Sequence, residues 1–191
     1  MNIIETSIPG VFILEPLVFG DERGYFFESY NQQAFDRAVG PIRFVQDNES
    51  KSRYGVVRGL HFQKGIHSQS KLVRVVSGRV LDVAVDIRRG SPWFGQHVCC
   101  ELSAENKRQF FVPKGFAHGF AVLSPEAVFQ YKCDALYSRE SEGAIAWDDP
   151  SLGIDWGIPA QDVILSEKDR HHPRLEEAED LFDYHIDYYA L

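Results

Sequence analysis

The chain has 191 residues, of which 44% are hydrophobic and 25% charged, a balance typical of a globular protein with one substantial core. Its formal net charge of -8 argues against nucleic acid or an anionic membrane as the main partner, but allows a local basic pocket for a phosphorylated small molecule. No apolar run approaches the roughly 20 residues of a membrane helix, and the first five residues show no signal peptide. The cysteines, Cys99, Cys100 and Cys133, are odd in number, so we expect reduced thiols and a cytoplasmic location.

Short apolar runs separated by turn signals predict strands along most of the chain. In chain order we expect strands at 11–18, 44–48, 71–76, 80–87, 97–102, 109–112, 121–123 and 127–133, an extended aromatic segment at 25–30, and a Gly-rich bend at 113–120. The turn at 77–79 is interpreted as the tip of a hairpin that joins its two flanking strands. One helix is predicted at 31–39, capped by Asn31.

The C-terminal part differs from this pattern. We expect a loop at 147–156, a short helical turn that opens at 166–169, and either a terminal helix or a packed extension at 176–183. About nine or ten short strands with little helix indicate an all-β sandwich or barrel. No linker or repeat divides the chain, so residues 1–191 are expected to form a single domain.

The hexapeptide RGLHFQ at 58–63 follows two valines, so it lies in or beside a strand. Histidine has an unperturbed pKa of about 6.5 and can act as a base near neutral pH. Strand alternation points His61 away from Leu60 and Phe62. It also puts Arg58 on the face opposite to that of His61. We therefore expect a bulge or twist at Gly59 if Arg58 and His61 line one pocket. The alternative for His61 is a satisfied core histidine.

Several motifs together resemble the dTDP-4-dehydrorhamnose 3,5-epimerase family. They are DERGYFFE at 21–28, QDN at 46–48, RGLHFQ at 58–63, KLVRV at 71–75, GRVLDVAVDIR at 78–88, PKGFAHGF at 113–120, YKC at 131–133 and WDDP at 147–150. They follow the family's order and cover most of the chain. The resemblance implies a cupin-type jelly-roll barrel with short, mainly C-terminal helical segments, and a homodimer that uses no metal and no cofactor.

The implied activity is that of an isomerase in dTDP-L-rhamnose biosynthesis. Such an epimerase inverts C3 and C5 of dTDP-4-dehydro-6-deoxy-D-glucose through enolate intermediates and produces dTDP-4-dehydro-L-rhamnose. By resemblance, His61 is the base, Asp169 orients its ring, and Tyr131 is the acid on the far side of the sugar. Lys71 faces the C4 oxygen, where negative charge develops, and either the substrate's phosphates or Asp82 is expected to keep Lys71 protonated.

Other positions match the family's substrate contacts. They are Arg23, Phe26, Glu28, Gln46, Asn48, Arg58, His118, Tyr137, Glu142, Lys168 and Phe19. The two arginines suit phosphates, and Tyr137 suits stacking on thymine, with Phe19 on its other side. By resemblance, Arg23, Phe26 and Glu28 reach into the partner subunit's site.

A metal is also disfavoured by the residues themselves. A metal cupin usually brings two histidines one residue apart, whereas His61 is followed at that spacing by the amide Gln63. His118 is the only other nearby candidate, and two imidazoles do not complete a catalytic site. His171 and His172 are interpreted as surface residues.

The other candidate residues also have purely structural interpretations. Tyr131 fits a packed sheet tyrosine, Lys71 an edge-strand lysine, and Asp169 a carboxylate at a helix start. Three other functions are also compatible with the sequence: a mono-epimerase that acts at C3 or C5 only on a related dTDP-4-keto-deoxysugar, a metal-dependent cupin oxygenase, and a non-catalytic sugar-nucleotide binder.

Overall fold

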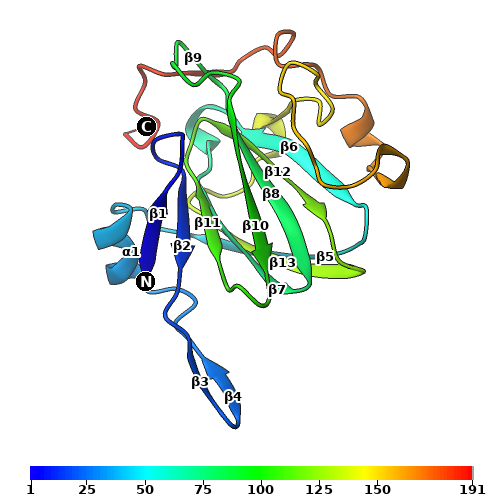
Figure 1. Cartoon of the computed structure of the whole chain (residues 1–191). Coiled ribbons are helices and arrows are strands. Elements are labelled where there is room, and N and C mark those ends of the chain that lie inside the picture. The colour runs from blue at the N-terminus through cyan, green and yellow to red at the C-terminus, as the bar shows by residue number, and fades with distance from the viewer. Residues whose placement is uncertain (191) are drawn as a thin grey trace.

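Two antiparallel sheets packed face to face form the body of the chain in the computed structural model (Figure 1). The six-stranded sheet has the order β1 (Asn2–Glu5), β2 (Phe12–Glu15), β11 (Gln109–Val112), β7 (Lys71–Ser77), β13 (Glu126–Cys133), β5 (Gln46–Arg53). The five-stranded sheet has the order β10 (His97–Ser103), β8 (Arg79–Asp86), β12 (Phe116–Val122), β6 (Val57–Gln63), β14 (Glu142–Ala144). This arrangement confirms the all-β jelly roll. The structure describes residues 1–190, so the last residue of the expected domain, Leu191, lies outside the described range.

Most predicted strands are present, but their pairing corrects one prediction. The strands on either side of Gly78, β7 and β8, belong to different sheets and do not form a hairpin. Val73, Val75 and Val80 all pack in the core between the sheets, so the two strands face each other across it. The tight turn was identified correctly, but at this point the chain crosses between layers. The bend expected at 113–120 is also shorter, because β12 already begins at Phe116.

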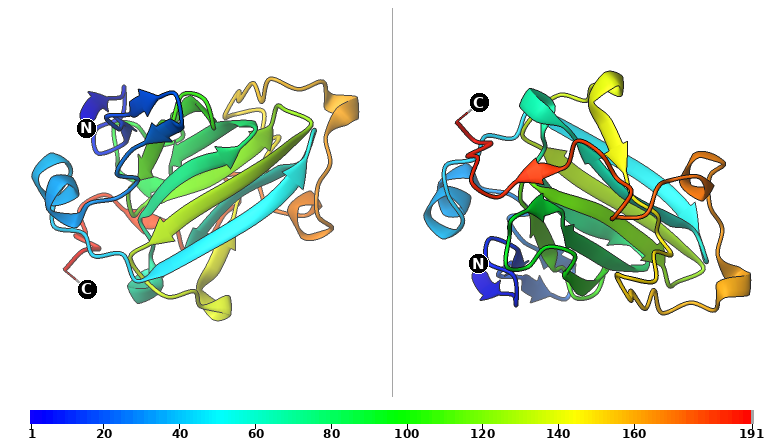
Figure 2. Two further views of the ribbon diagram at one scale, coloured as in Figure 1. Left: turned by 90° about the horizontal axis from the view of Figure 1, so that it is seen from below. Right: turned by 90° about the horizontal axis from the view of Figure 1, so that it is seen from above.

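Two apolar layers hold the sheets in place. The inner layer lies between the sheets and includes Phe110, Phe120 and Phe129, all buried. The outer layer covers the far face of the five-stranded sheet with residues of the C-terminal segment, such as Trp156 and Phe182. Figure 2 shows this segment, in orange and red, running across that face. The residues at 176–183 therefore form a packed extension, which ends in β15 (Phe182–Asp183) alongside β9 (Arg88–Arg89).

Helical structure is limited to short pieces. The predicted helix is confirmed as α1 (Gln32–Ala38), and the Asn31 side chain caps it by accepting a hydrogen bond from the Ala34 amide. Four 3₁₀ turns follow within the described residues: η1 (Gly65–His67), η2 (Arg139–Ser141), η3 (Ala160–Asp162) and η4 (Lys168–Arg170). No helix in residues 1–190 is long and apolar enough to cross a membrane.

The predicted irregularity at Gly59 is confirmed. Across the β6–β12 ladder, His61 pairs with His118 and Arg58 pairs with Phe120, so two residues of β6 lie opposite the single residue Gly119. This bulge changes the alternation of β6, because Val57 and Leu60, three residues apart, both pack in the outer layer. Arg58 and His61 are thereby turned toward the same side of the sheet.

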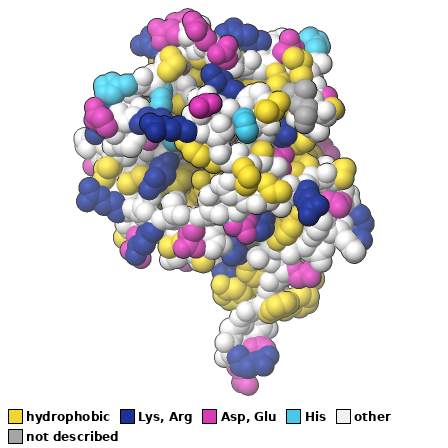
Figure 3. All heavy atoms as spheres, turned by 180° about the vertical axis from the view of Figure 1, so that it is seen from behind, with side chains coloured by type: hydrophobic (Ala, Val, Ile, Leu, Met, Phe, Trp, Pro, Cys, Tyr) yellow, Lys and Arg dark blue, Asp and Glu magenta, His cyan; other side chains and the backbone are white. Residues whose placement is uncertain are grey.

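One hairpin stands away from the body. It consists of β3 (Phe19–Asp21) and β4 (Gly24–Phe26), which project below the sheets in Figure 1. Its aromatic side chains are open to solvent, with Phe19 59% and Phe26 67% exposed. Figure 3 shows apolar side chains along this hairpin and charged ones at its tip.

Candidate active site

A cavity of about 300 Å³ opens between the two sheets. The six-stranded sheet contributes Lys71 from β7 and Tyr131 from β13, and the five-stranded sheet contributes His61 from β6. His61 and Tyr131 therefore lie on opposite walls of one cavity. The full lining is Gln46, Asn48, His61, Phe62, Gln63, Gln69, Lys71, Tyr131, Tyr137 and Glu142.

His61 is held from behind by a carboxylate. Its Nε2 lies 2.5 Å from Oδ1 of Asp169, which η4 presents to the strand. An ionised carboxylate can only accept hydrogen bonds, so Nε2 carries the proton and Nδ1 keeps a free lone pair. The hydrogen bond expected between Asp169 and His61 is present.

Two further groups hold the same carboxylate. The Ser166 hydroxyl donates to Asp169 Oδ2 at 2.8 Å, and Nε2 of His172 donates to Oδ1 at 3.2 Å. Burial opposes ionisation of Asp169, but the hydrogen bond and charge of His61, with the bonds from Ser166 and His172, outweigh it and lower the pKa of Asp169 to about 2. Ser166 also accepts from the Asp169 amide, so the helix-start role of this residue coexists with its contact to His61.

His172 was wrongly interpreted as a surface residue. Its side chain is only 11% exposed and bonds to Asp169, whereas the neighbouring His171 is 71% exposed and pairs with Glu167. A pair of adjacent histidines gives no sequence signal that separates an inward from an outward side chain. The turn after η4 decides which of them faces the site.

His61, Asp169 and His172 also bear on the sequence argument against a metal. That argument considered only His61 and His118, whereas potential ligand atoms of these three residues lie within 4.8 Å of one another. Two imidazoles and a carboxylate are a donor set that divalent ions accept. In this structure His61 and His172 are each hydrogen-bonded to Asp169.

Burial keeps the phenol of Tyr131 neutral. It raises the pKa of Tyr131, Cys133 raises it further, and the charge of Arg58 acts in the opposite direction. The Tyr131 hydroxyl is therefore protonated at neutral pH, as a proton donor must be. The ring also packs against the inner core, so the role of a sheet tyrosine is fulfilled at the same time.

Lys71 has competing influences on its charge. Burial lowers the pKa of Lys71, while Cys133, Asp82 and Glu142 raise it through their charges. The sequence-based idea that Asp82 supports the ammonium agrees in direction with this result. Asp82 is fully buried, and one of its oxygens, Oδ2, has no hydrogen-bond partner among the described residues.

His118 is not among the residues that line the cavity. It is buried, and its Nε2 bonds to Oδ1 of Asp82 at 2.8 Å. Burial lowers the pKa of His118, and Asp82 opposes this effect. His118 is thus placed directly beside His61 in the neighbouring strand, as part of a second histidine–aspartate pair.

The polar rim of the cavity is connected by hydrogen bonds. Glu142 accepts from the Tyr137 hydroxyl at 3.0 Å and pairs with Lys168 at 2.5 Å. Gln46 donates to Asn48 at 3.0 Å and accepts from the Tyr137 amide at 3.1 Å. All five belong to the predicted substrate contacts. Arg58 does not line the cavity, but bonds to Ser52 at 3.1 Å and acts on Tyr131 through its charge.

Besides Arg58 and His118, which lie next to the cavity without lining it, four predicted residues lie away from it within one subunit. Phe19, Arg23 and Phe26 lie on the projecting hairpin, and Glu28 follows it and bonds to Asn31. Conversely, Gln63 and Gln69 line the cavity although neither was predicted as a contact. Gln63 could have been found from the alternation of β6, since it shares the face of His61.

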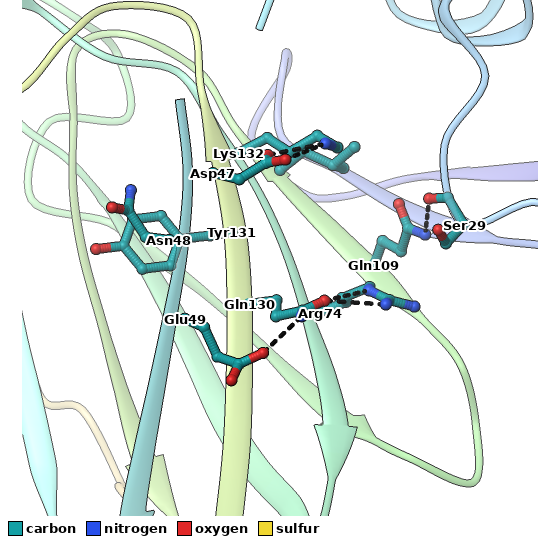
Figure 4. Close-up of a pocket in the computed structure, with 10 residues that line it drawn as sticks. Ser29, Asp47, Asn48, Glu49, Arg74, Gln109, Gln130, Tyr131 and Lys132 are labelled. Atoms are coloured by element: carbon teal, nitrogen blue, oxygen red, sulfur yellow. Dashed lines mark hydrogen bonds and ion pairs between the residues drawn. The ribbon is translucent and has the colours of Figure 1, made fainter. Parts of the chain in front are cut away.

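The six-stranded sheet has a second polar hollow, whose lining shares Asn48 and Tyr131 with the cavity (Figure 4). Its side chains bond to one another, as in the contact of Arg74 with Gln130 at 2.9 Å and that of Lys132 with Asp47 at 2.8 Å. In Figure 4, Asn48 and Tyr131 turn away from these pairs, to the other side of the strands. This alternation separates the charged outer face from the cavity that contains His61.

A jelly roll with a carboxylate-held histidine, a half-buried tyrosine and a lysine around one cavity defines a cupin-type protein with candidate acid–base groups. The model of the family described as dTDP-4-dehydrorhamnose 3,5-epimerase matches residues 5–177. The chain belongs to this family.

Known proteins agree along nearly the whole chain. The dTDP-4-dehydrorhamnose 3,5-epimerase of Salmonella typhimurium is 58% identical over 179 residues, which are 93% of this chain and 97% of that protein. The crystal structure of dTDP-6-deoxy-D-glucose-3,5-epimerase RmlC from Legionella pneumophila, in complex with dTDP-4-keto-L-rhamnose, is 53% identical and superposes with a TM-score of 0.92, covering 97% of this chain and 99% of that one. A 3'-monoepimerase, ChmJ from Streptomyces bikiniensis, is 32% identical with a TM-score of 0.87, covering 94% of this chain and 92% of that one.

Proposed function

We propose that this chain is an isomerase that inverts C3 and C5 of dTDP-4-dehydro-6-deoxy-D-glucose and forms dTDP-4-dehydro-L-rhamnose. The observation that carries the proposal is the placement of His61 and Tyr131 on opposite walls of one cavity, with Lys71 between the same sheets. Inversion requires a base and an acid on opposite faces of one ring. The relatives named for the double epimerisation are also closer in sequence than the 3'-monoepimerase, at 58% and 53% against 32% identity.

The first step is proton removal beside the C4 ketone. We assign it to Nδ1 of His61, the nitrogen left free by the bond between Nε2 and Asp169. When Nδ1 takes the proton, the imidazolium is stabilised by the ionised carboxylate behind it. A positioned base of this kind typically contributes about 10²–10⁴-fold to the rate.

The enolate oxygen then needs positive charge, and the carbanion needs a proton from the far side. Lys71 is the cation in the cavity and is assigned to the C4 oxygen, where such a donor is typically worth roughly 3–4 kcal/mol. Tyr131, kept protonated by burial, is assigned to deliver the proton opposite His61. After each inversion His61 releases its proton to solvent and Tyr131 regains one from solvent, so that the same pair of groups can act once at C3 and once at C5.

The nucleotide is assigned to the polar rim. Tyr137, which is 55% exposed and tethered to Glu142, presents an aromatic face suited to stacking on thymine. Lys168 and Arg58 supply positive charge for the diphosphate. Gln46 and Asn48 present amides toward the sugar, and His118 is assigned a supporting contact beside His61.

We further propose a homodimer whose sites are completed by the partner subunit. The hairpin exposes Phe19 and Phe26 far from the cavity of its own subunit, together with Arg23 at its tip. Solvent-exposed aromatic side chains on a projecting arm are typical of an interaction surface. In this arrangement Arg23, Phe26 and Glu28 reach the neighbouring site, and Phe19 joins the thymine contact.

Two remaining features are part of the proposal. Residues 1–191 act as one domain, without a metal or other cofactor. The free thiols Cys99, Cys100 and Cys133 are suited to a reducing compartment, so we place the enzyme in the cytoplasm.

The variant His61→Asn tests the function directly. An amide keeps the approximate size and polarity of the imidazole but cannot take the substrate proton, so we expect turnover to fall by about 10³-fold or more. The affinity for dTDP, measured by calorimetry, should change less than about threefold, since His61 does not hold the nucleotide. Full activity of this variant would exclude His61 as the base. A loss of dTDP affinity would show that His61 contributes to nucleotide binding instead.

A further inference from the structure

We propose that His172 is a positioning residue that acts through Asp169 and sets how strongly this carboxylate holds the base His61. The inference rests on the proposed function, because it concerns the basicity of the proposed catalytic histidine. It assigns a role to a side chain outside the cavity lining that shares the Asp169 carboxylate with His61.

The geometry places His61 and His172 in competition for one oxygen. Both Nε2 atoms donate to Oδ1 of Asp169, at 2.5 Å from His61 and 3.2 Å from His172. The two imidazole rings lie 5.8 Å apart at 85° to each other, so neither blocks the other's approach. Oδ2 is occupied by Ser166, which leaves Oδ1 as the oxygen that the two histidines share.

Sharing one acceptor has a definite electrostatic consequence. Each hydrogen bond to a carboxylate withdraws part of its charge, so the donor from His172 weakens the pull of Asp169 on a protonated His61. Loss of that donor would make His61 hold a proton more tightly. The enzyme would then need a higher pH to keep the base free.

The protonation state of His172 itself does not change near neutral pH. Its side chain is 11% exposed, and burial lowers the pKa of His172, while Asp169 opposes and a charged His61 adds to the effect. It therefore donates to Asp169 as a neutral ring at neutral pH. His172 also lines an outer cavity of about 710 Å³ that contains Lys168 and Glu142.

Other charged groups face this pair from the surrounding elements. They are His118 on β12, Glu142 on β14, Lys71 on β7 and Lys168 on η4, of which Lys71 and Glu142 line the cavity together with His61. None of these is altered by a substitution at position 172. A change in the pH dependence of such a variant therefore reports the contact with Asp169.

Two variants separate the donor from the packing of the ring. His172→Gln can still offer an N–H to Asp169, whereas His172→Leu fills similar space without a donor. His171→Leu is the matched control, because His171 is exposed and makes no contact with Asp169 within the described residues. Thermal unfolding of each variant establishes that it is folded before activity is compared.

The readout is the pH profile of kcat/KM for the dTDP-4-keto sugar. We expect the acid limb of His172→Leu to move upward by about half a unit to one unit, with a three- to ten-fold loss on the acid side and little loss on the plateau. His172→Gln and His171→Leu should retain the wild-type profile. An unchanged limb in His172→Leu, a downward shift, or an equal loss at every pH in both His172 variants would overturn the proposal.

A second measurement is independent of turnover. Imidazole nitrogen NMR of the free enzyme should show the His61 titration midpoint moving to higher pH in His172→Leu and unchanged in His172→Gln. If the wild-type enzyme does not epimerise the substrate, the proposed function fails, and the NMR titration still decides the role of His172. Coincident His61 titrations in the wild type and His172→Leu would contradict it.

Discussion

His61 offers a free ring nitrogen to the cavity, while Tyr131 offers a phenol proton from the opposite sheet. The surroundings of the two side chains prepare one of them to accept a proton and the other to donate one. Asp169 fixes the tautomer of the imidazole, and burial keeps the phenol from ionising. His61 can thus accept a proton at the ring nitrogen that Asp169 leaves free, and Tyr131 retains a phenol proton that it can give.

In the proposed mechanism, Lys71 is the residue whose charge stabilises the enolate intermediate. The variant Lys71→Met keeps the length of the chain but removes the ammonium, so kcat should fall by about 10²–10³-fold. The affinity for dTDP should change little, since the nucleotide is assigned to the rim. Steady-state kinetics and calorimetry check the two parts separately.

A matched control is Lys51→Met on β5, an exposed lysine that pairs with Glu126 on the outer edge of the sheet. It should keep full activity. If Lys71→Met also kept its kcat, the enolate oxygen would have to be stabilised by another group.

At this scale the sequence motifs predicted most of the cavity. Seven of the lining residues, including His61, Lys71 and Tyr131, were expected from the motifs. His172 was missed because its role depends on the path of the chain after η4, which leaves no periodic signal. Gln69 was missed because it lies in a loop, where alternation does not apply.

The β6 bulge is the element that turns His61, the proposed base, toward the same side as Arg58. Gly59 has φ +146, and a Cβ there would lie 2.6 Å from Gly119 Cα and 3.2 Å from the His118 carbonyl oxygen. The variant Gly59→Ala must therefore move β6 away from β12. We expect a loss of roughly 2–4 kcal/mol in the free energy of unfolding, and a loss of activity because Arg58 and His61 turn out of register.

Gly153→Ala provides the comparison, since Gly153 also has a positive φ, +60, but has nothing within 4 Å of an added Cβ. It should cost about 1 kcal/mol and leave kcat/KM intact. Urea unfolding and kinetics of both variants make the test. Equal effects of the two alanines would show that backbone conformation alone, without the contact between β6 and β12, accounts for the loss.

Strand positions were predictable from local signals, but strand partners were not. The bulge at Gly59 followed from a conflict that the sequence itself displays, namely two site residues on opposite faces of one strand. The pairing of β7 was predicted wrongly because a tight turn looks the same whether it closes a hairpin or crosses between sheets. Only the packing of Val73, Val75 and Val80 in one core distinguishes the two cases.

At the scale of the whole molecule, the projecting hairpin is not explained by the fold of one subunit. If Arg23 serves the neighbouring site, Arg23→Glu and His61→Asn damage different components of each site. Each variant alone should be nearly inactive. When equal amounts of the two variants are unfolded and refolded together, about a quarter of the wild-type activity should be recovered. Half of the dimers are then mixed, and each mixed dimer has one intact site.

The same mixture gives a different result if each active site is built from one subunit alone. In that case both subunits of a mixed dimer carry one defect in their own site, and activity stays at the sum of the two variants. Recovery above that sum requires exchange of the hairpin between subunits. Sequence resemblance predicted this arrangement, whereas composition and periodicity gave no indication of it.

The most direct test of the central claim is the reaction in deuterated water, with the label at C3 and C5 of the product located by NMR. Two inversions with a base and an acid on opposite faces predict deuterium at both carbons for the wild-type enzyme and at neither for His61→Asn. Label at one carbon only would contradict the double inversion. Label at both carbons with His61→Asn would contradict the assignment of His61 as the base.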